Sequence, residues 1–336
     1  MTLRRINAHD AHAFGQWFEV LRRSEHDRNG GVEDGWLPDE IRARSLDATA
    51  STYLQLFAFE VDGAIVAVAW LEVTRDDNLT SAYATLEVDP AHRRRGHGTR
   101  ALEALERTAV AQGRRTLVVA TKETKHEWGR SASRFFAPRH GYLVSEENVE
   151  RDLEWPRPPG ALDELNARWL PYAHDYEILS WRGAIDDAFV EDRAHLSSVM
   201  PVEAPHGSRP VEAEHWDAQR VRTHEHTVDA MGRDLLVSVA RHRASSRLVG
   251  FSELTVSRER PGLAYQWDTL VLRTHRGHRL GGLMKVANLG QLERFNYATT
   301  RVVTFNETSN FAMINVNEQL GATTGGGYVL WVKYFK

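Results

Sequence analysis

The fold of this chain is decided by the stretch Leu86-Glu87-Val88-Asp89-Pro90-Ala91-His92-Arg93-Arg94-Arg95-Gly96-His97-Gly98. The alternating run 83–88 predicts a strand, and Pro90 ends its ladder because proline has no N–H to donate. Apolar residues recur on one face between residues 101 and 110, which predicts a helix that begins near Thr99. The two glycines let backbone N–H groups turn toward a ligand, and the helix N-terminus adds partial positive charge. This loop is therefore predicted to bind a pyrophosphate.

The same pattern returns 183 residues later, as Thr269-Leu270-Val271-Leu272-Arg273-Thr274-His275-Arg276-Gly277-His278-Arg279-Leu280-Gly281. Each copy is preceded by alternating runs joined by turn residues, Asp62-Gly63 in the first and Pro261-Gly262 in the second, which are typical of antiparallel connections. Each helix is followed by a short apolar run, at 116–120 and 302–305. One module is therefore present twice.

Helices, an antiparallel meander, an Arg-x-x-Gly-x-Gly loop, a helix and a diverging strand resemble the GNAT superfamily of N-acetyltransferases. Arg93, Gly96 and Gly98 match this loop in full, whereas the second copy has Arg279 where the first glycine is usual. Downstream, residues 306–321 resemble the second acetyl-CoA segment of the family, Asn-x-x-Met-x-x-Val-Asn-x-x-Leu-Gly. The resemblance implies an α/β (α+β) fold with two tandem GNAT-like modules, each a mixed, mostly antiparallel sheet flanked by helices.

The resemblance also implies that both loops bind acetyl-CoA. In module one the expected cofactor-binding residues are Leu86, Val88, Arg93, Arg94, Arg95, Gly96, His97, Gly98 and Thr99. In module two they are Thr269, Val271, Arg276, Gly277, His278, Arg279, Leu280, Gly281, Gly282, Asn306 and Asn310. Gly96, Gly98 and Ala101 also match a dinucleotide-binding fingerprint, but the preceding meander and the three arginines argue against it. A structural turn without a ligand is the other interpretation.

Acetyl transfer to an amine needs a base, because a protonated amine has no lone pair to attack the thioester. In module two, Asp268 and Glu253 lie on the strands expected near the acetyl group and are the predicted catalytic residues, with ordinary solvent-facing strand residues as the alternative. The family polarises the thioester carbonyl with a backbone N–H of the strand before the loop. Its tyrosine, the proposed acid for the CoA thiolate, falls at Phe136 in module one and Asn317 in module two. Because module two keeps more polar groups, it is favoured as the catalytic module.

The proline-rich stretch 156–160 divides the chain, since prolines stiffen a linker and prevent a strand from continuing. The predicted domains are residues 1–155, an N-terminal GNAT-like acyl-CoA-binding domain, and residues 176–336, a C-terminal GNAT-like domain, joined by a connector at 156–175. The first domain is expected to end in a strand at 143–155 that a polar turn at 146–148 interrupts.

Composition limits the classes of function. The net charge of −4 gives no support for broad nucleic-acid binding. The chain has no cysteine, which excludes disulfides and thiol nucleophiles and agrees with a reducing compartment. No segment resembles a signal peptide or a membrane span. We therefore expect a cytoplasmic protein that is a monomer or homodimer. We expect no metal, because His224 and His226, two apart on a helix, point in different directions.

The predicted function is direct transfer of acetyl from acetyl-CoA to an amine of a small molecule or peptide, without an acyl-enzyme. Small amines, aminoglycoside-like antibiotics, amino acids and peptide N-termini all fit as acceptors. The second interpretation is a non-catalytic acyl-CoA-binding or regulatory protein, because both modules lack the tyrosine. The third is a scaffold that binds no nucleotide.

Overall fold

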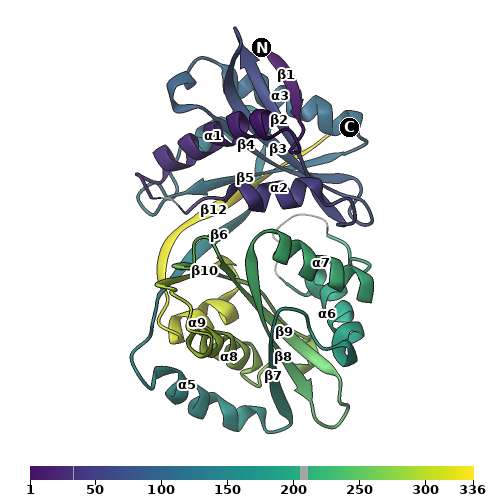
Figure 1. The fold of residues 1–336 in the computed structure, drawn as a ribbon, viewed down its shortest axis with the longest axis vertical. Helices are drawn as coiled ribbons and strands as arrows, with labels where there is room; N and C mark the ends of the chain where they lie inside the picture. The colour runs from purple at the N-terminus through teal and green to yellow at the C-terminus, as the bar shows by residue number, and fades with distance from the viewer. Residues whose placement is uncertain (33, 205–210) are drawn as a thin grey trace. The chain divides into compact units, whose positions relative to one another are not determined.

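The chain forms two compact units in this computed structural model, unit 1 with residues 1–147 and 326–336, and unit 2 with residues 148–325. The structure describes residues 1–32, 34–204 and 211–336. Each unit contains a mostly antiparallel sheet with helices on both faces (Figure 1). This architecture confirms the predicted fold class.

The sheet of unit 1 has the strand order β1–β2–β3–β4–β5–β12. Its strands are β1 (Thr2–Ile6), β2 (Thr52–Val61), β3 (Ala64–Thr74), β4 (Ser81–Val88), β5 (Thr116–Glu123) and most of β12 (Thr323–Tyr334). Neighbouring strands are antiparallel except β4 and β5, which are parallel. The predicted Asp62-Gly63 turn joins β2 to β3, and both residues have the positive φ that such a turn requires, 50° and 80°.

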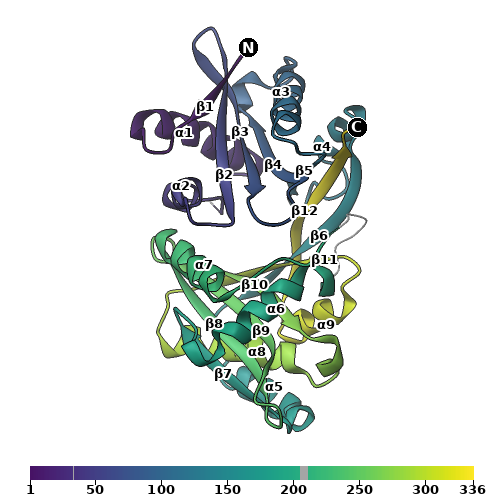
Figure 2. The ribbon, with the colours of Figure 1, turned by 90° about the vertical axis from the view of Figure 1, so that its right-hand side faces the viewer.

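Two pairs of helices cover the sheet of unit 1 on opposite faces (Figure 2). One face carries α1 (Ala11–Arg28) and α2 (Pro38–Leu46), and the other carries α3 (His97–Ala111) and α4 (Ser133–Arg139). Asp10 starts α1 by accepting hydrogen bonds from the N–H groups of His12 and Ala13. Phe14 and Trp17 of α1 are fully buried on one face of the sheet, and Leu105 of α3 is buried on the other.

Unit 2 repeats this plan with the strand order β6–β11–β10–β9–β8–β7. Its strands are part of β6 (Leu143–Glu154), then β7 (Tyr176–Arg182), β8 (Arg233–His242), β9 (Leu248–Ser257), β10 (Leu263–Val271) and β11 (Arg301–Glu307). One core lies beneath α6 (Val190–Glu203) and α7 (Ala218–Ala230). The second core lies beneath α5 (Ala161–Trp169), α8 (Leu280–Arg294) and α9 (Phe311–Gln319).

The last strand of each sequence module lies in the sheet of the other unit. β6 pairs antiparallel with β11, from Arg301 opposite Glu154 to Glu307 opposite Asn148, within unit 2. β12 pairs with β5 within unit 1, from Thr116 opposite Tyr334 to Glu123 opposite Gly327. The boundaries expected at residues 155 and 176 therefore differ from those of the compact units, because strand pairing exchanges the two ends.

Strand β6 runs without interruption from Leu143 to Glu154, so the turn expected at 146–148 is wrong. The residues expected in the turn are paired instead: Asn148 lies opposite Glu307 of β11, and the Glu147 carboxylate pairs with Arg134. Pairing satisfies groups that a reading of local polarity assigns to a turn.

The segment expected as a connector contributes to the core of unit 2. Leu165 and Trp169 of α5 are buried together with Leu283 and Val286 of α8. A Cβ at Gly282 would lie 2.6 Å from the Trp169 ring, so this close approach of α5 to α8 depends on the glycine. Residues 161–169 are thus part of the second unit rather than a spacer.

Candidate functional site

The two predicted loops have the same backbone course, each beginning with a short 3₁₀ turn, at Pro90–His92 and Arg273–His275. Each loop then places two residues in the left-handed region. In unit 1 these are Arg94 (φ 62°) and Gly96 (φ 77°), and in unit 2 they are Gly277 (φ 90°) and Arg279 (φ 59°). The loops use one glycine and one arginine at equivalent positions, in opposite order. Arg279 therefore adopts the conformation that a glycine provides in the first loop, at the steric cost of a Cβ.

Both helices after the loops begin without a side-chain cap, α3 at Gly96 and α8 at Arg279. The first N–H groups of a helix have no intrahelical acceptor, so they are free to bind an anion. Arg93 and Arg276 brace the loops, since their Nε atoms donate to the carbonyls of Val88 (3.1 Å) and Val271 (3.0 Å). This arrangement suits a pyrophosphate held mainly by backbone N–H groups.

In each unit, the two central parallel strands separate before the first of them reaches the loop. Pairing of β4 with β5 ends at Ala84 and Val119, so Leu86 and Val88 lie on the part of β4 that has left β5. A Cβ at Gly98 would lie 3.6 Å from both Val88 and Phe136. The glycine thus keeps open the space between the strand and α4, next to the separated strands.

The same separation occurs in unit 2, where pairing of β10 with β11 ends at Tyr265 and Val303. Thr269 and Val271 lie beyond this point, and a Cβ at Gly281 would lie 3.7 Å from Thr269 and from Met313 of α9. Thr269, Val271 and Gly281 therefore lie beside the separation of β10 from β11, as Leu86, Val88 and Gly98 lie beside that of β4 from β5.

The remaining expected residues of unit 1 have different surroundings. Arg94 and Arg95 are exposed beside the loop. Thr99 Oγ1 lies 3.2 Å from His140 Nε2. His97 is buried, and burial together with the charge of Arg100 lowers its pKa, which favours the neutral ring.

In unit 2, the loop lies against the turn after α5. His278 Nδ1 is 3.0 Å from the Tyr172 carbonyl oxygen, and the Arg279 guanidinium lies 5.5 Å from the centre of the Tyr172 ring. Leu280 is buried in the core. Asn310 begins α9 by accepting from the Met313 N–H at 3.3 Å, and so serves as a helix cap.

Strand β10 carries a bulge that β4 lacks. Gln266 pairs with Leu254 and Thr269 with Ser252, so Trp267 and Asp268 together face the single residue Glu253. The register of β3 with β4 is unbroken. A bulge leaves the extra residue outside the hydrogen-bonded ladder and re-aims its side chain. The bulge of unit 2 thus leaves a backbone group and the Asp268 carboxylate outside the ladder. At the corresponding position of unit 1, β4 pairs regularly with β3.

Glu253 is buried, and both of its carboxylate oxygens have partners. Arg193 Nη2 donates to its Oε1 at 2.5 Å, and His224 Nε2 lies 3.3 Å from its Oε2. Burial opposes ionisation, but the Arg193 and His224 charges and their hydrogen bonds hold the pKa of Glu253 well below its usual range. His224 is therefore not a free residue on a solvated helix face, as its spacing suggests, but a partner of Glu253. Within the described residues no cluster of side chains fits a metal ion.

The pKa of Asp268 shifts in the opposite direction, upward. Burial among neighbouring groups and the negative charge of Glu253 raise the pKa of Asp268 to about 6, against the opposing charges of Arg193 and His224. Its side chain is exposed to solvent, so water offsets part of the burial effect and the adjacent Glu253 charge gives the firmer reason for the direction. A carboxylate of this kind can take a proton near neutral pH.

Unit 1 has its own carboxylates, Glu25 and Glu87, and both are more enclosed than Asp268. Glu87 accepts a hydrogen bond from Ser24 Oγ at 2.6 Å and pairs with Arg28. Burial and the Glu87 charge raise the pKa of Glu25 to about 7. A Cβ at Gly35 would lie 1.8 Å from the Glu25 carboxylate, so the loop before α2 packs directly on it. The sequence gives no local signal for Glu25, because its shift depends on this long-range contact.

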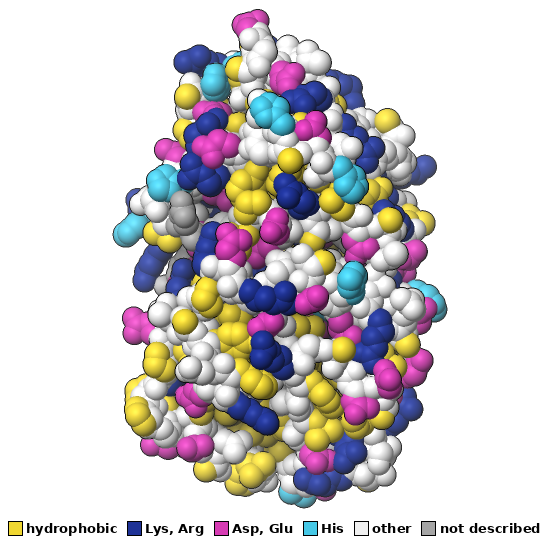
Figure 3. All heavy atoms as spheres, viewed as in Figure 1, with side chains coloured by type: hydrophobic (Ala, Val, Ile, Leu, Met, Phe, Trp, Pro, Cys, Tyr) yellow, Lys and Arg dark blue, Asp and Glu magenta, His cyan; other side chains and the backbone are white. Residues whose placement is uncertain are grey.

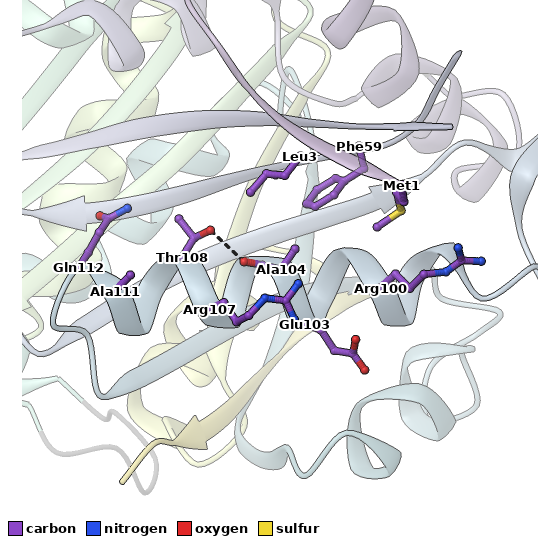
Figure 4. Close-up of a pocket in the computed structure, with 10 residues that line it drawn as sticks. All are labelled: Met1, Leu3, Phe59, Arg100, Glu103, Ala104, Arg107, Thr108, Ala111 and Gln112. Atoms are coloured by element: carbon purple, nitrogen blue, oxygen red, sulfur yellow. Dashed lines mark hydrogen bonds between the residues drawn. The ribbon is translucent and has the colours of Figure 1, made fainter. Parts of the chain in front are cut away.

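A pocket of about 580 Å³ lies along α3, and none of its lining residues is among the expected cofactor residues (Figure 4). Arg100 and Arg107 of α3 and Leu3 of β1 line it. The equivalent of Arg100 on α8 is Leu283, which is buried beneath α5. Unit 2 thus covers a helix face that unit 1 leaves open.

The surface and helices agree with the charge and hydropathy of the sequence. On the face drawn in Figure 3, basic and acidic side chains are interspersed rather than gathered by sign. None of the helices in the described ranges is long and apolar enough to cross a membrane.

Comparisons with known proteins agree with this geometry. The model of the acetyltransferase (GNAT) family matches residues 16–142. The chain is 30% identical over 230 residues to a mycothiol acetyltransferase of Saccharomonospora viridis, a match that covers 57% of this chain and 70% of that relative. It is 34% identical over 117 residues to an amino-acid acetyltransferase of Pseudomonas fluorescens, covering 34% of this chain and only 27% of that relative.

Solved structures share the doubled fold. A tandem GNAT protein from the clavulanic acid biosynthesis pathway matches with a TM-score of 0.76 and 22% identity, over 99% of this chain and 98% of that one. A GCN5-related N-acetyltransferase from Sphaerobacter thermophilus matches with a TM-score of 0.66 and 16% identity, over 99% and 95% of the two chains. The chain therefore belongs to the GNAT family of acetyltransferases. It is a tandem member, with two GNAT modules in one polypeptide.

Proposed function

We propose that this protein is an acetyl-CoA-dependent N-acetyltransferase in which unit 2 transfers the acetyl group directly to an amine, with Asp268 as the general base. The observation that carries the proposal is the bulge in β10. Because of this bulge, the exposed Asp268 carboxylate and Trp267 together face Glu253, on the part of β10 that lies beyond its pairing with β11.

The residues around Asp268 have complementary tasks in this proposal. Asp268 removes a proton from the acceptor ammonium, so that the amine gains the lone pair it needs. The backbone of the bulge offers a donor outside the ladder for the carbonyl oxygen of the acyl group. Glu253 keeps Arg193 and His224 in place and maintains the affinity of Asp268 for a proton.

Both loops fit the pyrophosphate of CoA, because each has an uncapped helix N-terminus, two left-handed residues and a glycine facing the separated strands. In unit 1 these are the loop around Gly96 and Gly98, and in unit 2 the loop around Gly277 and Gly281. Bound acetyl-CoA would supply the activated thioester. The acceptor is an amine of a small molecule or peptide, as the names of the acetyltransferase relatives suggest.

Release of free CoA thiol from acetyl-CoA, measured with a panel of amines, tests the proposal. Asp268→Asn is expected to lower kcat by ~10²-fold or more, the usual scale for a lost general base, with little change in acetyl-CoA affinity. Glu25→Gln and Glu87→Gln are the matched changes in unit 1 and are expected to leave turnover nearly unchanged. Loss of turnover in Glu25→Gln with full activity in Asp268→Asn would show that unit 1 is the catalytic one.

The same assay distinguishes the proposed enzyme from the alternative, a non-catalytic acyl-CoA-binding protein. The features in its favour are Phe136 and Asn317 at the tyrosine position of the two modules. Tight binding of acetyl-CoA with no thiol release for any amine in the panel would support that alternative.

A further inference from the structure

The core of unit 2 contains a lysine with an unusual environment. Lys285 lies on the sixth position of α8 and is 2% exposed. Its Nζ donates a hydrogen bond to Asn317 Oδ1 at 2.8 Å. Among the residues that the structure describes, no carboxylate pairs with it. A buried ammonium without a counter-charge is costly, and burial lowers the pKa of Lys285 to about 7.

Lys285 determines how the Asn317 amide is oriented. An ammonium can only donate, so it must face the amide oxygen rather than the NH₂ group. The Asn317 NH₂ group then points away from Lys285, and one of its N–H bonds donates to Asn306 Oδ1 at 2.6 Å. The second N–H has no acceptor within the described part of the chain. The buried Asn317 amide therefore retains one N–H that donates to no described residue.

This leftover donor occurs where the family pattern places a proton donor. Asn317 stands at the tyrosine position of module two, and its partner Asn306 lies on β11 beyond Val303, the last residue paired with β10. The amide therefore lies beside the strand that forms one wall of the opening. Unit 1 has no such arrangement, since the residue equivalent to Lys285 is Leu102 and the residue in the last turn of α4 that corresponds to Asn317 of α9 is Ala137. The carbonyls of Ala137 and Asn317 each accept from the N–H five residues later.

We propose that Lys285 is a positioning residue that holds the Asn317 amide with one N–H directed at the sulfur of the departing CoA, in place of the absent tyrosine hydroxyl. This inference rests on the proposed function of unit 2. When the amine nitrogen bonds to the acyl carbon, the C–S bond breaks and its electron pair goes to sulfur. The Asn317 N–H and the nearby Lys285 charge stabilise this thiolate. Asp268 already holds the proton of the acceptor ammonium, so the second proton, which nitrogen loses as the amide forms, passes to solvent. No proton moves through the amide, and solvent protonates the thiolate after release.

The ionisation of bound CoA tests the inference without any acetyl transfer. The chain contains no cysteine, so only CoA carries a thiol, and the difference between titrations with and without CoA removes the absorbance of ionising tyrosines. In a Gly98→Val background, where CoA is expected to bind only to unit 2, the pKa of the bound thiol should lie about one unit below that of free CoA. This shift corresponds to tenfold stabilisation of the thiolate.

Lys285→Met should abolish this shift, while calorimetry shows CoA affinity within about twofold of the parent, because one thiol contact adds little to binding of the whole cofactor. In the wild-type background it should also lower kcat by about 10–100-fold and change the alkaline limb of the kcat–pH profile. Leu102→Met, at the equivalent position of α3, is the matched control and should leave the thiol pKa unchanged. Asn317→Asp, which keeps the size but cannot donate while ionised, should reproduce the effect of Lys285→Met if that variant does not fold.

The outcomes are distinct. An unchanged thiol pKa in Lys285→Met or Asn317→Asp, with CoA still bound, overturns the inference but not the proposed function. Loss of CoA binding by the Gly98→Val protein overturns both, because no thiolate would then reach Asn317. A shift that disappears in both variants and persists in Leu102→Met supports the inference.

Discussion

At the residue scale, two carboxylates on neighbouring strands of unit 2 ionise in opposite ways. Glu253 is buried between Arg193 and His224 and remains charged, and this charge raises the proton affinity of Asp268 across the bulge. The strength of a base at this position therefore depends on a second carboxylate, Glu253, whose pKa is lowered by Arg193 and His224. Such divergence of two neighbouring acids is typical of sites that transfer protons.

The pH dependence of turnover follows from this arrangement. Asp268 acts as a base only when ionised, and its pKa is raised to about 6. We therefore expect kcat to rise with pH through about 6 and to level above it, when measured by thiol release at saturating substrates. In Asp268→Asn the residual rate should lose this limb. A limb near pH 6 that persists in that variant would assign the titration to another group.

At the element scale, the loop that joins a strand to a helix forms the proposed cofactor site in each unit. The two loops reach one backbone geometry with glycine and arginine in exchanged positions, Arg94 and Gly96 against Gly277 and Arg279. The second glycine of each loop, Gly98 or Gly281, faces the strand rather than solvent. It is the position at which a side chain would enter the binding space directly.

Gly98→Val is expected to remove CoA binding from unit 1 and leave it in unit 2. The added Cβ would meet Val88 and Phe136 at 3.6 Å, an ordinary contact distance, so the fold should tolerate it while the space between strand and helix is filled. Calorimetric titration with CoA should then show one of the two sites lost, and Gly281→Val should remove the other. The same stoichiometry in wild type and Gly98→Val would contradict the assignment of this loop.

At the scale of the whole molecule, the exchange of β6 and β12 makes each unit depend on residues from far along the chain. Val329 and Trp331 of β12 are buried in the core of unit 1, and Trp331 Nε1 donates to Thr121 Oγ1 at 2.8 Å. A unit that begins at residue 1 is therefore completed only by residues 326–336.

Trp331→Ala should consequently destabilise unit 1. Removing a buried tryptophan costs about 3–5 kcal/mol of unfolding free energy through lost burial and the cavity left behind. We expect a lower thermal transition and loss of CoA binding by unit 1, followed by calorimetry and circular dichroism. The control is Tyr334→Ala on the same strand, whose exposed ring should contribute within about 0.5 kcal/mol. Equal effects of the two changes would argue against the exchanged strand.

The sequence alone determined the doubled module, the position of both loops and the residues that surround them. These features depend on local patterns, such as alternating runs, a proline that ends a ladder, and glycines before a helix. Asp268 was also predicted as a site residue from its place on a strand.

The tertiary structure decided how these parts combine. The partners of β6 and β12 were not predictable, because any strand with suitable alternation can pair at either open sheet edge and the choice depends on long-range contacts. The bulge at Trp267 and Asp268 and the link between Lys285 and Asn317 likewise join residues far apart in sequence. Their ionisation and orientation depend on burial and neighbouring charge, which only the packed chain supplies.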